Sequence, residues 1–472
     1  MTKEIYFATI ITNSKFIISF RKVIYMTGDL TKGSVMKSIL LFALPMILGN
    51  LLQQCYNIAD TLIVGKFIGS NALAAVGSSF TLMTFITSII LGLCMGSGAL
   101  FSIRFGQKDE TRLKESMFAS FILIGVLTLL LNIASFALSE KILVFLQVPS
   151  DVIDLMREYI LIIFWGIAAT FIYNYFASLL RAVGNSVVPL LFLAVSAVLN
   201  IILDLYFVIV LNKGVGGAAE ATVISQYVSS IGIAAYTAIK IPYLRISKKH
   251  CKITLNNIKE ISSFSILTCI QQSVMNLGIL AVQGIVNSFG SAVMAAFAAT
   301  VKIDAFAYMP VQDFGNAFST FIAQNYGAKN EERIKKGFKV AMITSVSFGI
   351  AVSILVWIFA RNLMVIFIDP SEIEIIAEGI RYLHIEGAFY CGIGCLFLLY
   401  GLYRALGKPG MSVVLTVISL GVRVLLSYTL SKVPQIGVVG IWWSIPIGWF
   451  LADFAGLLYY AVKKKTIIKW EK

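Results

Sequence analysis

The sequence predicts an all-α polytopic membrane protein with twelve transmembrane helices in two pseudo-symmetric six-helix bundles. Of its 472 residues, 58% are hydrophobic and only 13% are charged, and the mean hydropathy is +0.87. Soluble domains carry about twice this share of charged residues. The apolar residues come in runs of about 20, the length that a helix needs to cross a bilayer core of roughly 30 Å. A transmembrane β-barrel would show short alternating segments instead.

An internal repeat predicts the two bundles. Placing each residue beside the one 221 positions later aligns Gly-containing turns and charged residues of the two halves, and an offset of 223 does the same further along. A duplicated, strongly apolar chain is typical of membrane transporters, in which the substrate is handled where the repeats meet. The aligned pairs include Gly69 with Gly290, Gly106 with Gly327, Arg112 with Arg333 and, at the larger offset, Arg181 with Arg404.

Each half supplies six apolar segments. An even number per half leaves both halves in the same orientation, so the axis that relates them runs along the membrane normal. In chain order we expect spans over residues 38–64, 72–101, 116–138, 158–180, 187–211 and 216–239, and then over 261–287, 293–322, 338–360, 382–403, 411–431 and 437–462.

The connections between these spans are polar or contain helix breakers. Residues 104–115 and 325–339 share a Gly, Lys and acid pattern, so both are expected to be short cytoplasmic hinges. Pro149 and Pro370 lie in the two long outer connections, where proline ends a helix. The segment 240–260 is the longest polar connection and joins the halves. It is either an ordinary loop or a basic contact with anionic lipid head groups.

The Lys and Arg residues set the orientation. With the N-terminus inside, 29 of the 38 fall in cytoplasmic segments, seven in external loops and two inside spans. By the positive-inside rule, both termini are therefore cytoplasmic, and the net charge of +14 reflects topology rather than nucleic-acid binding. The expected domains are a tail over 1–37, bundles over 38–239 and 261–462 on either side of the linker, and a basic tail over 463–472. Met26 reads as a natural start, so we expect residues 1–25 to be either an upstream extension or a mobile tail, without a role in transport.

Two acids stand out among the ionisable residues inside spans, where each such residue costs free energy and is a functional candidate. Asp60 lies near the outer end of span 1, and Asp204 lies about two turns from the outer end of span 5. Asn200 shares the helix face of Asp204, and Thr222 lies about two turns into span 6. These four oxygen-bearing side chains suit Na⁺. The carboxylates equally suit a proton, because a close pair does not readily keep both charges. The remaining alternative is that each acid only forms hydrogen bonds between helices.

Further polar residues are expected to line a wet substrate cavity. Gln53, Tyr56 and Asn57 crowd span 1 beside its acid, and Asn174 lies in span 4. Pro45 in span 1 removes a backbone hydrogen bond, so it allows a helix bend, although a tolerated kink is equally compatible.

The second half does not repeat the two acids, so the cation site is expected only once. Arg423 stands where the repeat aligns Asn200, and it needs an anion. Asp304 is the best candidate, giving either a buried structural pair or part of the substrate path. Lys302 is expected to be a third buried charge in this bundle, but it is two residues from Asp304 and cannot face it.

Four more acids lie within the predicted spans. Three of them are expected near span ends, where water is reachable, and Asp313 lies deeper without an obvious partner. The three near span ends are Glu220, Glu386 and Asp453, and the meaning of Glu220 stays open.

Several segments resemble those of bacterial MATE (multidrug and toxic compound extrusion) transporters, most closely the DinF-like and MepA-type branch. They are FALPMILGNLLQQCYNIADTLIVGKFIG, ALAAVGSS, SIRFGQKDE, LLRAVGNS, VLNIILD and GVGGAAEATVISQ, and the likeness covers residues 30–462. It implies a V-shaped pair of bundles that alternate between outward-open and inward-open states. It also implies efflux of amphipathic, usually cationic compounds in exchange for Na⁺ or H⁺.

The resemblance also implies where the coupling ion binds. In this branch it binds in the N-terminal bundle, at an acid of span 1, an Asn and Asp of span 5 and a Thr of span 6. These match Asp60, Asn200, Asp204 and Thr222. The other large branch uses acids of the C-terminal bundle, where span 10 offers only Glu386 here.

Other function classes fit less well. A lipid-linked sugar flippase is the alternative, but such relatives carry cationic residues in the central cavity, and the N-terminal half has none within its spans. GxSxG, HExxH and P-loop motifs are absent, so the sequence predicts neither an enzyme nor a nucleotide-driven pump. We expect a monomer in the bacterial plasma membrane, without a cofactor and without a nucleic-acid partner.

Overall fold

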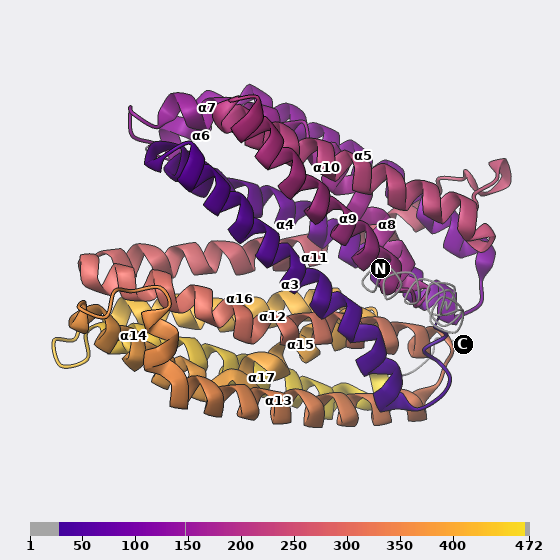
Figure 1. Cartoon of the computed structure of the whole chain (residues 1–472). Coiled ribbons are helices and arrows are strands. Elements are labelled where there is room, and N and C mark those ends of the chain that lie inside the picture. Colours follow the sequence, from indigo (N-terminus) through magenta and orange to yellow (C-terminus); the bar gives the residue numbers. More distant parts are fainter. Residues whose placement is uncertain (1–27, 147, 468–472) are drawn as a thin grey trace, which may run out of the picture.

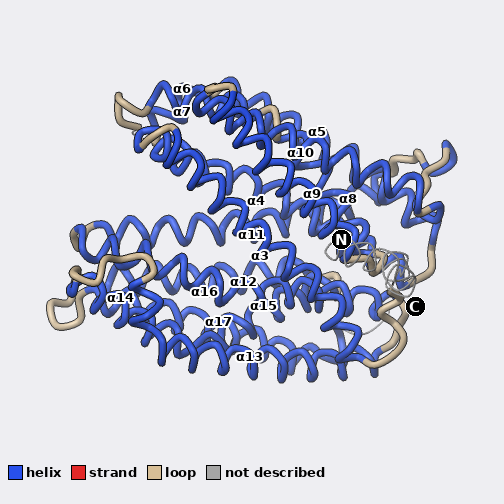
Figure 2. Tube along the Cα trace, viewed as in Figure 1, coloured by secondary structure: helices blue, strands red, loops and turns tan. Residues whose placement is uncertain are grey.

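The computed structural model describes residues 28–146 and 148–467, and its regular elements are helices throughout this part of the chain (Figure 2). The proposed extension over 1–25 lies outside the described residues. The first half forms α3 (Val35–Phe67), α4 (Ser70–Gly106), α5 (Glu110–Ala137), α6 (Ser139–Phe145), α7 (Ile153–Phe164), α8 (Ile167–Ala182), α9 (Val187–Asp204) and α10 (Gly214–Lys240). The second half forms α11 (Leu255–Asn287), α12 (Ser291–Gly327), α13 (Glu331–Val365), α14 (Ile373–Glu386), α15 (Tyr390–Ala405), α16 (Pro409–Leu430) and α17 (Val438–Ile467).

These helices occupy the places of the twelve predicted spans. Within the described residues, ten helices are long and apolar enough to cross a membrane, or eleven when the bent pair α7 and α8 counts as one. The remaining predicted span corresponds to α10, a helix of 27 residues whose many Gly, Ala, Ser and Thr residues lower its hydropathy. Spans 4 and 10 break at equivalent points, at Gly166 between α7 and α8 and in a 3₁₀ turn over Gly387–Phe389.

The backbone repeats in the two halves as the sequence predicts. Lys108 and Lys329 both take a left-handed conformation, with φ of 58° and 56°. Each is followed by an N-cap residue, Asp109 before α5 and Asn330 before α13. The cap side chain accepts a hydrogen bond from the backbone N–H three residues later, at 3.0 and 3.1 Å. Such a cap satisfies one of the free N–H groups of a helix start, so both halves begin their third span in the same way.

The first span crosses between the bundles (Figure 1). Residues in its N-terminal half, including Ile39, Phe42 and Met46, belong to the hydrophobic core of the C-terminal bundle. Near its C-terminal end, Ile63 and Val64 belong to the core of the N-terminal bundle. In the other half, α11 packs extensively against α4. The first helix of each repeat therefore contacts the opposite bundle, which links the two bundles mechanically.

The bundles meet closely at one end and diverge toward the end that carries α6, α7 and α14 (Figure 1). At the closed end α4 and α12 cross at two aligned glycines. A Cβ atom on Gly106 would lie 2.0 Å from the carbonyl oxygen of Gln324, and one on Gly327 would lie 2.0 Å from that of Ile103. Because residue 103 aligns with residue 324 in the repeat, the crossing is reciprocal, and only glycine allows this backbone approach.

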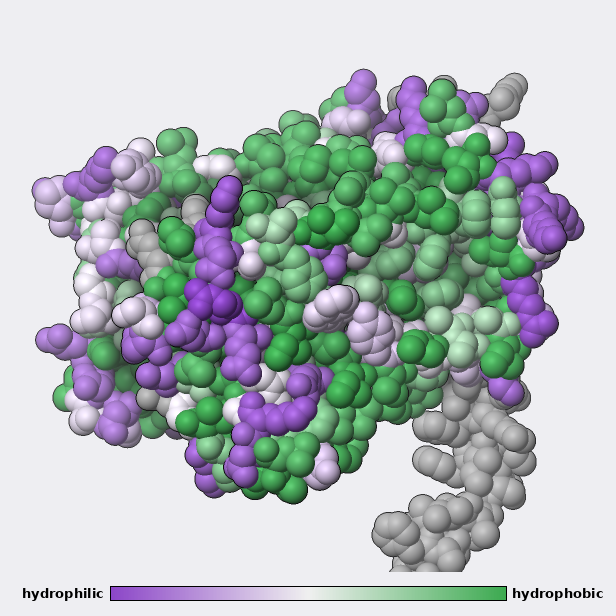
Figure 3. Space-filling view, turned by 90° about the horizontal axis from the view of Figure 1, so that it is seen from above, coloured by the Kyte–Doolittle hydropathy of each residue, from purple (hydrophilic) through white to green (hydrophobic). Residues whose placement is uncertain are grey.

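The outer surface is suited to lipid. Large hydrophobic side chains cover much of the face in Figure 3, and polar residues gather toward its two ends and in a band that reaches in from the left end. Leu129, Val198, Ile358 and Phe454 are among the exposed apolar residues. Since water does not favour so much exposed apolar surface, the protein lies in a membrane.

Candidate functional site

The two predicted acids meet between α3 and the end of α9. Asp204 is the last residue of α9, directly before a π-helical turn over Leu205–Val210, and turns of this kind are frequent at functional sites. Asp60 approaches from the C-terminal half of α3. The exposed fraction is 8% for Asp60 and zero for Asp204, and the two carboxyl groups lie close enough for the charge of one to act on the other.

The neutral oxygen ligands predicted for the same site also lie together. Asn200 and Thr222 are both buried, and the Asn200 Nδ2 donates to the Thr222 Oγ1 at 3.2 Å. This bond occupies the donor side of the Asn200 amide and leaves its oxygen available. Helices α3, α9 and α10 thus bring all four predicted residues into one region of the N-terminal bundle.

The site has acceptors without donors. Among the described residues, Asp60 Oδ1, Asn200 Oδ1 and both carboxyl oxygens of Asp204 are buried and have no hydrogen-bond partner. Buried polar atoms in proteins are nearly always paired, so four unpaired acceptors in one place need an explanation. A bound cation would satisfy several of these oxygens, and a proton on one carboxyl group would form a hydrogen bond with the other.

Two tyrosines lie near the acid pair. Tyr56 of α3 and Tyr159 of α7 both lie close enough to Asp60 and Asp204 for the carboxylate charges to act on their hydroxyl groups. Tyr159 is buried, and it is not among the site residues predicted from the sequence. Its place near the outer end of span 4 was the available signal, because that depth matches the depth of the acids.

The predicted cavity residues are less closely gathered. Gln53 is exposed on α3, and Asn57 on the same helix is half-buried. Asn174 lies on α8, where its amide donates to the carbonyl oxygen of Thr170 at 2.9 Å. Pro45 lies inside α3, which stays helical through it. The roles of these residues in substrate contact and bending stay predictions.

A second buried polar cluster lies in the C-terminal bundle. Asp304 of α12 accepts hydrogen bonds from the hydroxyl groups of Tyr382, at 2.7 Å, and Tyr390. Arg423 is close enough for its charge to act on Asp304, but the tyrosines are the direct hydrogen-bond partners. Glu386 lies beside the same groups and is buried, with its Oε2 unpaired among the described residues.

Several expectations about charged residues were wrong. Lys302 is exposed rather than buried, because it points away from the face of Asp304 and lies 5.8 Å from the ring centre of Phe367. Glu386 and Asp453 are buried rather than close to water, since neighbouring helices cover the ends of their spans.

Two further acids have partners that the sequence did not reveal. Asp313 accepts a hydrogen bond of 2.6 Å from the Asn50 amide of α3, so it joins the two bundles. Glu220 forms an ion pair of 2.5 Å with Lys213 at the start of α10. Neither pairing was predicted, because the first joins residues that are distant in sequence and the second depends on how Lys213 at the start of α10 is oriented.

Comparison with known proteins decides the family. The MatE family matches residues 45–206 and 267–429, once in each half of the chain. The chain belongs to the MATE family. Its members are transporters rather than enzymes, as the sequence predicted, and they have twelve transmembrane helices in two bundles.

Relatives match along nearly the whole length. The chain is 31% identical over 440 residues to the probable multidrug resistance protein YpnP of Bacillus subtilis, which covers 92% of the chain and 96% of the relative. It is 23% identical over 443 residues to the multidrug export protein MepA of Staphylococcus haemolyticus, covering 93% and 96%. The fold matches a MOP superfamily transporter from Pyrococcus furiosus with a TM-score of 0.88 at 24% identity, covering 93% and 98%.

Proposed function

We propose that this MATE transporter exports amphipathic, cationic organic compounds across the bacterial plasma membrane in exchange for Na⁺ or H⁺. The observation that carries the proposal is the group of unpaired buried oxygens around Asp60 and Asp204. Relatives named as multidrug resistance or export proteins support the substrate class. Neither a cofactor nor a bound nucleotide is part of this proposal, and the transporter works as a monomer.

The acid pair couples transport of the Na⁺ or H⁺ to transport of the organic cation through charge. Two buried carboxylates within reach of each other repel strongly, so the site favours a positive guest. Na⁺ would be held by carboxylate oxygens of Asp60 and Asp204 with Asn200 and Thr222 as neutral ligands, whereas a proton would bridge the carboxyl groups. Either guest removes the charge that attracts an organic cation. Ion binding from outside therefore favours release of the compound. Release of the ion inside restores the negative charge of the site, which can then attract another organic cation.

Helix α3 connects this event to the movement of the bundles. It carries Asp60 in its outer half, while its inner half packs into the C-terminal bundle and forms the Asn50–Asp313 hydrogen bond. A change in how α3 sits against α9 is therefore transmitted to the contact between bundles. Such a link between site and interface is what alternating access requires.

The structure corresponds to an outward-facing state in this proposal. The positive-inside rule assigns the end with residues 104–110 and 325–333 to the cytoplasm. The bundles are in close contact at that end, through Gly106 and Gly327, and diverge at the other (Figure 1). The Asp60 and Asp204 pair lies in the outer half, so it would load its ion from outside.

Transport in proteoliposomes tests the proposal. The parent protein should export a fluorescent organic cation when a Na⁺ gradient or a pH gradient is imposed separately. Asp60→Asn and Asp204→Asn should each reduce export at least about tenfold, because removal of one acid removes the competition between ion and compound. Glu220→Gln is the matched control, since Glu220 is an acid of the same bundle paired with Lys213. Full activity of both Asn variants would disprove the coupling.

The same assay distinguishes export of organic cations from the alternative function, flipping of a lipid-linked sugar. A pyrophosphate group needs buried cations, whereas the predicted site in the N-terminal bundle presents acids. Transport stimulated by a lipid-linked sugar, without transport of organic cations, would reverse the assignment.

A further inference from the structure

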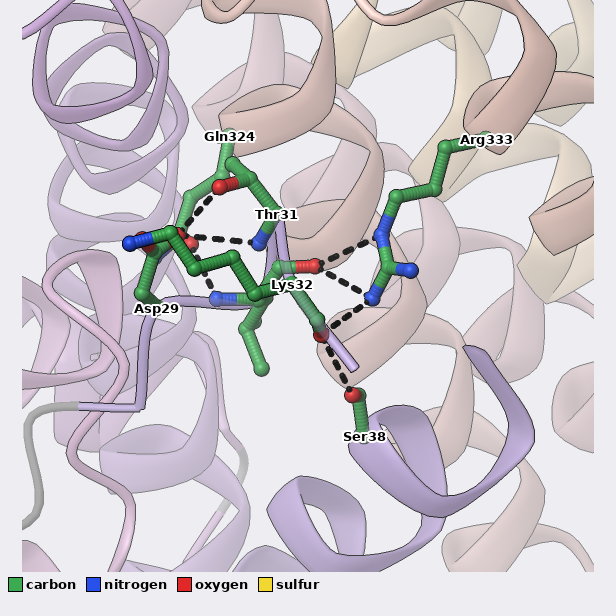
Figure 4. A network of polar contacts seen from close by, with 7 residues as sticks. Asp29, Thr31, Lys32, Ser38, Gln324 and Arg333 are labelled. Atoms are coloured by element: carbon green, nitrogen blue, oxygen red, sulfur yellow. Dashed lines mark hydrogen bonds and ion pairs between the residues drawn. The ribbon is translucent and has the colours of Figure 1, made fainter. Parts of the chain in front are cut away.

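Residues 28–34, called here the strap, precede α3 and lie beside Gln324 and Arg333 (Figure 4). They were counted with the N-terminal tail in the sequence analysis. In the structure Leu30 is only 5% exposed and belongs to the core of the C-terminal bundle. At its start, the strap touches the other bundle, where the Gly28 N–H donates to the Gly184 carbonyl oxygen at 3.2 Å.

Arg333 at the start of α13 holds the strap by its backbone. Its guanidinium group donates to the carbonyl oxygens of Leu30 at 3.0 and 3.1 Å, Lys32 at 2.6 Å and Gly33 at 2.6 Å. It also lies over the ring of Phe321, 5.2 Å from the ring centre. A planar guanidinium with five donors suits this arrangement, and a lysine would reach fewer of these acceptors.

Gln324 connects three parts of the protein at once. Its side chain lies on α12 and is fully buried. Its Oε1 accepts the Leu30 N–H at 3.0 Å, and its Nε2 donates to the Ala182 carbonyl oxygen of the N-terminal bundle at 2.8 Å. Asn325 adds a hydrogen bond to the Leu30 carbonyl oxygen at 3.2 Å. The strap and the closed contact between bundles therefore share one amide.

The repeat provides an internal comparison. Arg112 is the residue of the N-terminal bundle that aligns with Arg333, and it occupies the same position after a helix N-cap. Its side chain is 64% exposed and lies 3.5 Å from Asp109, its own cap residue. The strap contact is thus specific to one half, although the local fold is the same in both.

We propose that Arg333 and Gln324 position the strap so that it holds the cytoplasmic gate, the contact between the bundles at the closed end, shut. The strap stays with the C-terminal bundle, to which Leu30 and Arg333 attach it. The gate opens when Gln324 separates from Ala182 and Gly28 of the strap separates from Gly184. This inference rests on the proposed alternating-access function. It assigns Arg333 a role in the balance between the two states rather than in ion or substrate binding.

Distances between spin labels test the inference in the full-length protein. The six native cysteines are replaced, and labels are attached at Glu115→Cys and Lys336→Cys, aligned positions on α5 and α13 near the closed end. The parent should show mainly the short distance. Arg333→Gln should raise the ratio of the long to the short distance by about 2-fold to 10-fold, because a strap released from Arg333 no longer holds the Gly28–Gly184 hydrogen bond, which only the closed state makes. Arg112→Gln should leave the ratio unchanged.

Two additional variants keep the inference testable if Arg333→Gln does not fold. Arg333→Lys should give an intermediate ratio, and Gln324→Ala should raise the ratio with Arg333 still in place. Each variant is checked by gel filtration before measurement. Equal distance distributions for Arg333→Gln, Gln324→Ala and Arg112→Gln would overturn the inference, and if Arg333→Gln does not fold, an unchanged ratio in Gln324→Ala does so. If the gate inference is overturned but Asp60→Asn still stops transport, the proposed function stands. If instead the parent moves no organic cation, the proposed function fails while the distances still report on the gate.

Discussion

Gly106→Ala should open the closed end of the molecule. The added Cβ would lie 2.0 Å from the Gln324 carbonyl oxygen, whereas ordinary contact begins at 3.4 Å. The obstacle is backbone, which cannot rotate away as a side chain can. Helices α4 and α12 must therefore separate locally by about 1 Å, and overpacking of this kind costs about 1–3 kcal/mol.

This cost falls only on the state in which the bundles touch. The inward-open state does not make the contact, so the substitution should shift the ratio of inward-open to outward-facing molecules by about 5-fold to 150-fold. The spin-label pair at residues 115 and 336 measures this ratio. Export of an organic cation should fall as well, because the outward-facing state needs a closed cytoplasmic end.

Gly77→Ala is the matched control on the same helix. A Cβ at Gly77 meets nothing within 4 Å, so alanine there should leave the distances unchanged and add slightly to helix stability. Gly327→Ala should reproduce the effect of Gly106→Ala, since its Cβ would lie 2.0 Å from the Ile103 carbonyl oxygen. Unchanged distances in both Gly106→Ala and Gly327→Ala would refute the reasoning.

Three further outcomes are expected. Asn50→Ala leaves the buried Asp313 without its 2.6 Å donor, so the thermal unfolding midpoint should fall by an amount equivalent to about 1–3 kcal/mol, and an unchanged midpoint would contradict this. Tyr382→Phe removes a 2.7 Å hydrogen bond to Asp304 and should cost about as much in the same unfolding measurement, while a value near zero would show that Tyr390 suffices. Partial burial opposes ionisation of Asp29, but hydrogen bonds from Thr31 and Lys32 outweigh it and hold the pKa below its ordinary value of 3.8. The contribution of Asp29 to strap stability should therefore be fully present above pH 3.8 and lost only as the pH falls through the lower, folded-state pKa. The difference in label distances between the parent and Asp29→Asn should stay constant from pH 5 to 8, and a change in that difference near pH 6 would contradict the assignment.

The fold was predictable from local properties of the chain. Apolar runs of membrane-spanning length fixed the helices, and the offset of 221 residues fixed the two bundles. The N-caps Asp109 and Asn330, with the left-handed residues before them, lie where the repeat predicted a shared hinge. These features depend on residues close in sequence or on a repeated pattern, and both can be read without knowing the packing.

The candidate site was predictable in part, because depth in the membrane is a one-dimensional property. Asp60, Asn200, Asp204 and Thr222 could be placed at a similar height from topology alone, and the structure brings them together. Tyr159 shares that height, but nothing in its surroundings distinguished it from an ordinary apolar-face residue.

The sequence by itself determined the class of protein, its helices, its duplication and the approximate height of its acids, because hydropathy and spacing act along the chain. Only the tertiary structure decided which charges are paired. Asp313 binds Asn50 of the other bundle, Asp304 binds tyrosines, and Arg333 binds the backbone of the strap whereas Arg112 does not. Partners of this kind depend on the rotation of each helix about its axis and on contacts between residues up to about 300 positions apart, which no local pattern encodes.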